Sequence, residues 1–496
     1  MDYNIKGRNN QHKCNCNEEV TMKEKHSMEE KRNMEKDNTD IMINMPVPKA
    51  ILKLAIPTVL STIVSLIYNL TDTYFIGLLD DPIQLGAVSL AFPVFMVIQA
   101  VGNIFGNGAP SYISRCLGME KEKEARRTSA VSVYVSVAIT LVMTVLCLLF
   151  MEPILHILGA SADTIAPTRS YLYIIVGFSF VMTLQIILPA LLRSEGQVQQ
   201  AVIGMVIGTV LNIILDPIFI LVLHQGAAGA AWATIIGNFF AVLYYITIFL
   251  KGKTSLSIAP RDFKPSARIF REVLKIGLPN SISQIIMSFS NILLNNLAVG
   301  YGDYVISAYG VAGKLINMVF MITVGYVSGY MPFAGYNYGA NKIKRMLSAL
   351  KFTILSGTCL CLVLLVPFLW LAPAFVKAFT SDAQIIEVGV RFLRAYAWVV
   401  PFMAIQMSMM CTFQATGDAV RAMMVNLGRQ CLFNIPFLYL FNRLWGLDGL
   451  LHAQMGADIC TTVLGVLIGI PLLRRLDKLQ KQELQPGCEE SETEMV

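Results

Sequence analysis

Long apolar runs recur along most of the chain and are separated by short polar segments. Each run is about 20 residues or longer, the length that an α-helix needs to cross a hydrocarbon core of about 30 Å. A transmembrane barrel would instead show segments of about ten alternating residues. The pattern therefore predicts an all-α polytopic membrane protein with twelve transmembrane helices. These lie at about 51–77, 87–113, 128–150, 168–192, 200–223, 227–250, 272–299, 304–334, 347–371, 391–413, 421–441 and 449–472.

The segments between successive spans are alternately rich and poor in basic residues. They gather after the even-numbered spans, for example Arg126 and Arg127 after the second, whereas the loop after the first span carries only Asp80 and Asp81 as charges. Loops rich in Lys and Arg stay in the cytoplasm. We therefore expect a multi-pass protein of the cytoplasmic membrane with both termini on the cytoplasmic side.

The two halves of the chain repeat with a period of about 220 residues. LKLAIP at 52–57 corresponds to LKIGLP at 274–279, and RSEGQVQQA at 193–201 corresponds to QATGDAVRA at 414–422. Each half has six spans, so both enter the membrane in the same direction and form a parallel repeat. Two pseudo-symmetric six-helix lobes around a central cleft suit an alternating-access transporter. The expected units are a disordered cytoplasmic tail (1–47), an N-lobe (48–250), a cytoplasmic linker (251–271), a C-lobe (272–473) and a second cytoplasmic tail (474–496).

Composition excludes several other classes of protein. The chain is 55% hydrophobic, too apolar for a soluble domain of its size, and its ten Cys are scattered rather than arranged for disulfides. The net charge of +6 gives no reason to expect nucleic acid, because Lys and Arg lie between apolar runs. Gly252-Lys253-Thr254 lacks the upstream glycine of a phosphate loop. We expect no enzyme activity, no cofactor and no ATP-driven step.

One carboxylate stands out in the first span. Between Leu54 and Gly77 the only ionisable side chain is Asp72. A charge in a membrane helix costs about 2.5–3.5 kcal/mol on insertion scales, so such a residue is a functional candidate by default.

The fifth span adds a second carboxylate. Thr209, Asn212 and Asp216 are spaced three and four residues apart, on one helical face. Pro217 frees the backbone carbonyl of Ile213, which suits a cation site.

The topology puts further polar groups at the depth of these carboxylates. Asp72, Asp216, Thr234 of the sixth span and Tyr171 of the fourth all fall in the outer part of their helices. Two carboxylates in a low-dielectric pocket cannot easily both stay ionised unless a cation lies between them. Binding and release of H⁺ or Na⁺ there would serve ion coupling. Alternatively, the carboxylates only hydrogen-bond neighbouring helices, and Thr234 and Tyr171 only pack.

The second half differs from the first in its charges. Leu294 stands where the repeat would place Asp72. Lys314 and Asp458 both fall near mid-membrane, and Arg429 lies about two turns into its span. Pairing of Lys314 with Asp458 would offset two costly charges, and we expect such a pair, with either a structural role or a role at a substrate site or gate.

The sequence resembles the MATE (multidrug and toxic compound extrusion) family, in its bacterial DinF/MepA-like branch. The resemblance rests on LAIPTVLSTIVSLIYNLTDTYFIG, AVSLAFPVFMVIQAVGNIFGNGAPSYISRCLG, ALLRSEG and LNIILDPIFI and covers about 48–475. It implies a V-shaped pair of lobes and cation-coupled antiport of bulky, often cationic drugs. Acids that a related branch carries on helices 7 and 10 are missing here, which puts a second-lobe Na⁺ site in doubt.

The resemblance also implies roles for individual residues. The implied cation-binding residues are Asp72, Asn212, Asp216 and Thr234, and the substrate contacts expected are Asn69, Tyr171 and Met205. Soft methionines facing a cleft suit apolar ligands of varied shape. The expected partners are a lipophilic or cationic small molecule, H⁺ or Na⁺ and membrane lipid, with the chain acting as a monomer. The alternatives are a flippase for lipid-linked precursors, which would want more cations in its cleft, and a membrane receptor without transport.

Overall fold

The structure, a computed structural model, describes residues 40–77, 82–380 and 382–483. All regular structure in these ranges is helical. The first half forms α2 (Val47–Gly77), α3 (Pro82–Gly118), α4 (Glu122–Leu149), α5 (Met151–Ile157), α6 (Ile165–Gly177), α7 (Ser179–Ser194), α8 (Val198–Pro217), η1 (Ile218–Val222), α9 (Gly226–Leu250) and η2 (Pro260–Asp262). The second half forms α10 (Ala267–Val299), α11 (Asp303–Ser328), α12 (Tyr330–Gly339), α13 (Ile343–Trp370), α14 (Ala372–Lys377), α15 (Ala383–Ala397), α16 (Val400–Thr416), α17 (Ala419–Leu427), η3 (Gly428–Leu432), α18 (Asn434–Trp445) and α19 (Leu447–Glu483).

The predicted twelve-helix layout is confirmed, but three crossings are not straight. Nine helices of the described chain can span a membrane alone, and the pairs α6/α7 and α15/α16 each form one crossing bent by 48° and 50°. The second bend precedes Pro401, which has no backbone donor and fits only the first turn of a helix. The remaining crossing, predicted at 421–441, is divided into α17, the π-helical η3 and α18.

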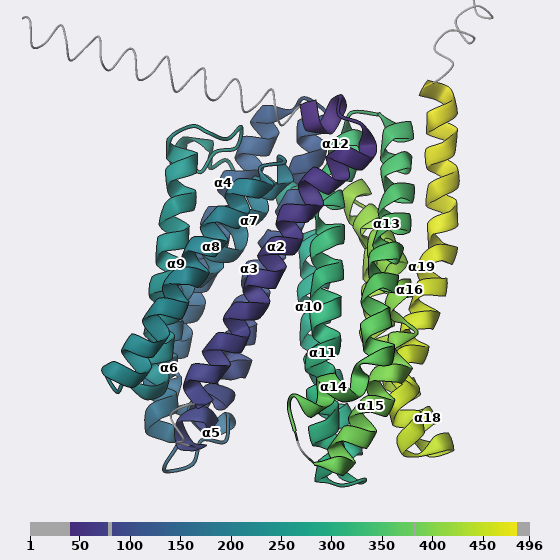
Figure 1. The fold of residues 1–496 in the computed structure, drawn as a ribbon. Helices are drawn as coiled ribbons and strands as arrows, with labels where there is room; N and C mark the ends of the chain where they lie inside the picture. Colours follow the sequence, from purple (N-terminus) through teal and green to yellow (C-terminus); the bar gives the residue numbers. More distant parts are fainter. Residues whose placement is uncertain (1–39, 78–81, 381, 484–496) are drawn as a thin grey trace, which may run out of the picture.

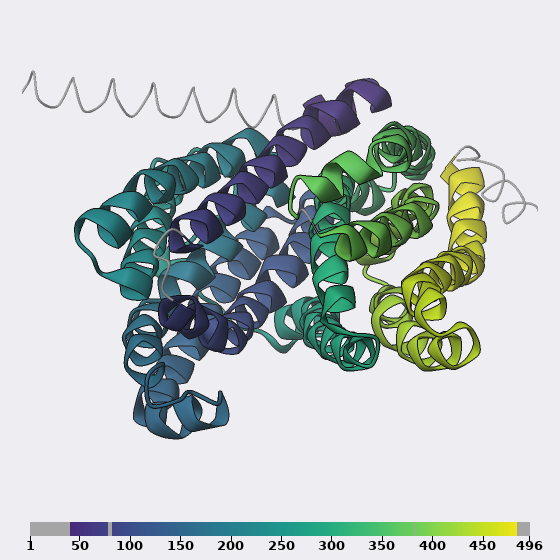
Figure 2. The same ribbon diagram turned by 60° about the horizontal axis from the view of Figure 1, so that its bottom comes forward.

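The helices form two lobes that meet toward one end of the molecule. α8 packs with α9 and α3 with α7 in the first lobe, and α18 packs with α19 and α13 with α16 in the second. Between the lobes, α3 contacts α10 and α12, and α2 contacts α11. Figure 1 shows α2 leaning from the first lobe toward α12 of the second, and Figure 2 shows the lobes side by side from a tilted direction. We call the end that carries α12 and the C-terminus of α19 the closed end.

Glycines let helix backbones touch at the closed end. A Cβ on Gly118 of α3 would lie 2.0 Å from the carbonyl oxygen of Tyr336 on α12, and a Cβ on Gly339 would lie 2.3 Å from that of Arg115. These two glycines are equivalent in the sequence repeat, so the contact between the lobes is nearly symmetric. Small residues allow this close approach of helices in membranes.

Polar groups reinforce the same contact between the lobes. Arg115 of α3 forms an ion pair with Glu272 of α10 at 2.9 Å. Lys275, one turn further along α10, donates a hydrogen bond of 3.1 Å to the carbonyl oxygen of Gly417. The closed end is therefore held by backbone packing together with buried or half-buried hydrogen bonds.

The residues before α2 form a strap, defined here as Asp40–Pro46, across this end. Ile41 and Met42 are buried in an apolar cluster of the second lobe, although they precede the first helix of the first lobe. Arg345 of α13 donates to the carbonyl oxygens of Met42 at 2.9 Å and Ile41 at 3.3 Å. A Cβ on Gly196 of the first lobe would meet the Met42 methyl group at 2.9 Å. Met42 thus bridges the two lobes.

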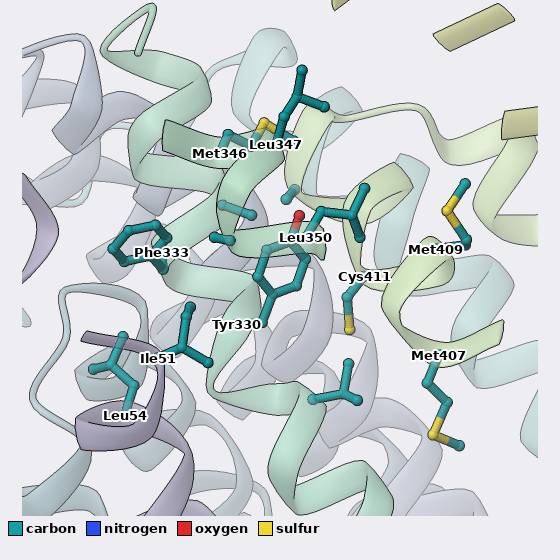
Figure 3. Close-up of a cluster of buried hydrophobic side chains, with 14 of the residues drawn as sticks. Ile51, Leu54, Tyr330, Phe333, Met346, Leu347, Leu350, Met407, Met409 and Cys411 are labelled. Atoms are coloured by element: carbon teal, nitrogen blue, oxygen red, sulfur yellow. The ribbon is translucent and has the colours of Figure 1, made fainter. Parts of the chain in front are cut away.

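Figure 3 shows part of this cluster, in which α2 reaches the second lobe. Ile51 and Leu54 of α2 lie beside Tyr330 and Phe333 of α12. The prediction of a disordered tail over 1–47 is therefore wrong for residues 40–47, which are folded. Residues 1–39 lie outside the described chain.

The predicted linker is bound to the first lobe rather than loose. Glu195 accepts hydrogen bonds from the Thr254 hydroxyl and, at 2.9 Å, from the Ser255 amide. Tyr134 donates to the carbonyl oxygen of Ile258 at 2.9 Å. The following helix, α10, begins at Ala267, and α19 continues beyond the predicted boundary at 473 to Glu483.

Gly277→Ala should destabilise the contact between the lobes. The added Cβ would lie 1.8 Å from the carbonyl oxygen of Ile104, so α3 and α10 must separate, at a cost of about 1–3 kcal/mol. Thermal unfolding of the purified protein in detergent measures this as a lower Tm. Gly310→Ala on α11 is the matched control, because nothing lies within 4 Å of its added Cβ. Equal Tm values for the two variants would contradict the glycine-packed interface.

Candidate functional site

A buried polar cluster lies between the fifth and sixth helices of the first lobe, α8 and α9. The helices approach closely because a Cβ on Gly237 would lie 2.6 Å from the carbonyl oxygen of Gly208. The amide of Asn212 donates to Asp216 Oδ1 at 3.3 Å and to Thr234 Oγ1 at 3.4 Å. Asn212 is 2% exposed and Asp216 is 0% exposed. Three of the four residues predicted for the cation site therefore lie together.

The first helix adds two residues that the sequence analysis missed. The Tyr68 hydroxyl and Thr234 Oγ1 share a hydrogen bond of 3.3 Å. Ser65 donates to the sulfur of Met205 at 3.8 Å, which places that predicted substrate contact at the interface of α2 and α8. The available signal was spacing, because Ser65 and Tyr68 lie on the same helical face as Asp72.

The other predicted residues of this lobe have the following positions. Asn69 and Asp72 belong to α2, but their side chains lie outside the described residues. Tyr171 on α6 packs against an apolar cluster that includes Ala231 and Ile235 of α9. It therefore adjoins the helix that carries Thr234.

The cluster offers oxygen atoms of three chemical kinds. It brings together the carboxylate of Asp216, the amide of Asn212 and the hydroxyl groups of Thr234 and Tyr68. Asn212 Oδ1 is buried and accepts no hydrogen bond from the described residues. Hard oxygen donors suit a proton or an alkali cation better than a transition metal. Within the described residues no group of three or more His, Cys, Asp and Glu side chains is assembled that could hold a metal ion.

The second lobe holds a different charge pair from the predicted one. Asp458 on α19 accepts a hydrogen bond of 2.7 Å from Nε of Arg429, which lies in η3. Tyr396 donates to Asp458 Oδ2 at 3.0 Å, and Gln454 donates to Asp458 Oδ1 at 3.3 Å. Asp458 is 1% exposed, so the ion pair offsets a carboxylate that would otherwise be buried without compensation.

Lys314 does not take part in this pair, so the predicted Lys314–Asp458 pair is wrong. The buried face of α11 is marked by Ala308, Ala312 and Leu315, and Lys314 lies off that face and is exposed. The expected depth in the membrane does not determine which face of a helix a side chain occupies.

The sequence repeat explains why the two lobes differ. Positions 222 residues after Asp72 and Asp216 are Leu294 and Leu438. Both leucines are buried in a single apolar cluster of the second lobe. Asn212 has a counterpart in Asn434, whose amide donates to Ser290 at 2.9 Å. The second lobe thus keeps the amide and replaces both acids with packing.

A cavity of about 370 Å³ adjoins the Arg429 pair. Nearly all its walls come from α10, α11, α16, α17 and η3 of the second lobe, and Asn107 of α3 is the first-lobe residue among them. Met287, Met321 and Met407 line it. A volume of this size falls within the usual range for small-molecule sites.

Asp458→Asn alone should lower stability much more than the same change at an exposed pair. It leaves the Arg429 charge buried without a partner, which costs about 3–5 kcal/mol. Arg429→Gln combined with Asp458→Asn should recover most of that loss, since no charge remains. The matched control is Asp448→Asn, whose partner Arg391 is about half exposed and whose loss costs less than about 1 kcal/mol. Thermal unfolding in detergent ranks the three variants, and equal losses for the Asp458 and Asp448 variants would contradict the buried pair.

Comparison with known proteins agrees with this architecture. The MatE family model matches residues 57–218 and 279–440, one stretch in each lobe. The multidrug export protein MepA of Staphylococcus aureus is 32% identical, over 89% of this chain and 97% of the relative. MepA of Staphylococcus haemolyticus is 31% identical, over 86% and 94%.

Solved structures give the same result for the fold. A crystal structure of MATE in complex with MaL6 is 26% identical with a TM-score of 0.84, covering 89% of this chain and 99% of that chain. The outward-facing conformation of a multidrug resistance MATE family transporter of the MOP superfamily gives a TM-score of 0.83 at 26% identity, covering 89% and 98%. The family match over both lobes and the identity to MepA agree with the twelve-helix fold, and the chain therefore belongs to the MATE family of membrane transporters, in its bacterial MepA-like branch.

Proposed function

We propose that this protein exports bulky lipophilic or cationic compounds across the cytoplasmic membrane in exchange for H⁺ or Na⁺. The names of the relatives, multidrug export proteins, support the substrate class. The observation that carries the coupling is the cluster in the first lobe in which buried Asn212 and Asp216 meet half-buried Thr234. In this proposal Asp72 completes the cation site.

The symmetry of the chain supports a pairing of Asp72 with Asp216. Their counterparts in the second lobe, Leu294 and Leu438, belong to one apolar cluster. Two carboxylates in such a position repel each other unless a proton or an alkali cation is bound. Loading and release of the ion would then change the packing of α2 against α8.

Helix α2 can carry that change to the other lobe. It packs against α8 in the first lobe and against α11 in the second, and its first turns reach α12. A shift of α2 therefore acts on the contact between the lobes as well as on the ion site. This gives the bound ion a route to bias which side of the membrane the cleft faces.

The closed end is the cytoplasmic end in this proposal. Arg115, Lys121 and Arg126 lie at or next to it, as the positive-inside rule requires. The conformation described here then opens away from the cytoplasm. We further propose Asn69, Tyr171 and Met205 as substrate contacts of the first lobe and a monomer as the transporting unit.

Asp216→Asn should abolish ion-driven transport while the protein still inserts and folds. The amide keeps the shape and the hydrogen bond with Asn212 but can neither bind a proton nor neutralise a cation. Ethidium flux in proteoliposomes measures this, with a pH gradient alone and then a Na⁺ gradient alone. Asp382→Asn is the matched control, because Asp382 caps α15 near the surface and an amide oxygen can accept the same two backbone hydrogen bonds.

The gradients separate the remaining alternatives. Flux driven only by pH would identify protonation as the coupling event, and flux driven only by Na⁺ would identify a metal-ion site. Normal flux through Asp216→Asn would contradict a coupling role for the cluster. Absence of ethidium flux in the unchanged protein would favour a different substrate, first a lipid-linked precursor.

A further inference from the structure

The cavity of the second lobe has an unusual combination of walls. Besides Met287, Met321 and Met407, the side chains of Met331 and Met410 line it, and Phe320 forms part of the wall beside Arg429. Flexible thioethers adapt to flat aromatic ligands of varied shape. The cavity therefore provides a polarisable surface next to a fixed positive group.

Arg429 is held so that part of its guanidinium is left for a ligand. Of its five N–H donors, Nε bonds to Asp458 at 2.7 Å and Nη2 bonds to the Tyr396 hydroxyl at 3.3 Å. Among the described residues no further acceptor is bonded to the remaining donors. The guanidinium also stacks on Phe320, 4.5 Å from the ring centroid. Its orientation is fixed from three sides while it lines the cavity.

Three amides of the wall bond to one another, and Arg429 is the charged side chain among the residues that line the cavity. Asn426 and Gln414 both donate to Oδ1 of Asn280, at 2.9 Å and 3.3 Å. Lys314 is not among the residues that line the cavity. The cavity thus contains one guanidinium that is already balanced by Asp458.

This charge balance points to one class of ligand. A free cationic wall would repel cationic drugs, but the Arg429–Asp458 pair has no net charge and so tolerates them. The open donors of Arg429 still favour a planar acceptor, above all a carboxylate. A pyrophosphate would require more than one cation, so a lipid-linked headgroup fits poorly.

We propose that this cavity is a second substrate subsite, which binds the carboxylate-bearing end of flat aromatic zwitterions through Arg429. The proposal rests on the export function proposed above and names the residue that recognises a carboxylate on the exported compound. Arg429 is then a residue that determines specificity, and Asp458 and Tyr396 are positioning residues that act through it.

Two dyes with the same ring system test the proposal. Rhodamine 110 carries a free carboxylate and is a zwitterion, whereas rhodamine 123 is its methyl ester and a cation. Fluorescence polarisation gives the dissociation constant of each dye with the purified full chain in detergent, without any ion gradient. The measured quantity is the ratio of the two constants, rhodamine 123 over rhodamine 110.

The decisive variant is Arg429→Gln combined with Asp458→Asn, which removes the guanidinium without leaving a buried charge. We expect the ratio to fall about tenfold, the effect of losing one hydrogen-bonded charge pair. Arg429→Lys keeps the charge but loses the planar fork. Its ratio should therefore lie between that of the unchanged protein and that of the double variant. Arg421→Gln with Asp418→Asn is the matched control, because this Arg–Asp pair does not line the cavity.

The outcomes separate this inference from the proposed function. An unchanged ratio in the Arg429/Asp458 double variant, or equal falls in both double variants, would overturn the subsite. Failure of the unchanged protein to bind rhodamine 110 would also overturn it. Ethidium flux in proteoliposomes is recorded for the same proteins, so loss of the ratio with retained flux supports the subsite. Absence of flux in the unchanged protein would count against the export function alone.

Discussion

Helix α3 packs backbone to backbone against α10 and α12, and the arrangement of both lobes depends on this contact. At Gly118, Gly277 and Gly339 no side chain separates the helices. In a membrane the apolar side chains gain little by leaving lipid, so close packing and hydrogen bonds must hold the helices together. The ion pair of Arg115 with Glu272 adds a charged contact at the same level. Close packing of helix backbones therefore joins the lobes at the closed end. Their other ends remain available for movement.

The polar groups inside the lobes follow a second rule, which the repeat makes visible. Each lobe places a polar cluster with a buried Asp between its fifth and sixth helices, where neither lipid nor water satisfies it. In the first lobe the helices touch at Gly208 and Gly237, and the polar cluster lies one turn beyond. In the second lobe Arg429 of η3 forms an ion pair with Asp458 of α19. One architecture thus holds an acidic site in one lobe and a balanced ion pair in the other.

The sequence alone was sufficient for the spans, the two lobes and most of the acidic cluster. Spacing on α8 and equal depth brought Asn212, Asp216 and Thr234 together correctly. It could not determine the partner of Asp458, because two cations lie at similar depth and only the orientation of α11 excludes Lys314. Local patterns also miss the strap, since its contacts with Arg345 join residues about 300 positions apart. Such contacts depend on how the lobes meet and not on any single helix.

The strap ties the beginning of α2 to both lobes at once. Met42 lies against Gly196 of one lobe and inside an apolar cluster of the other. The chain thus reaches its first membrane helix through the joint of the molecule rather than along its periphery. Opening of the joint must therefore break the contacts of Met42 with one lobe or carry the strap along with it. The strap therefore makes the start of α2 part of the joint itself, so that the chain before the first helix and the two lobes must move together.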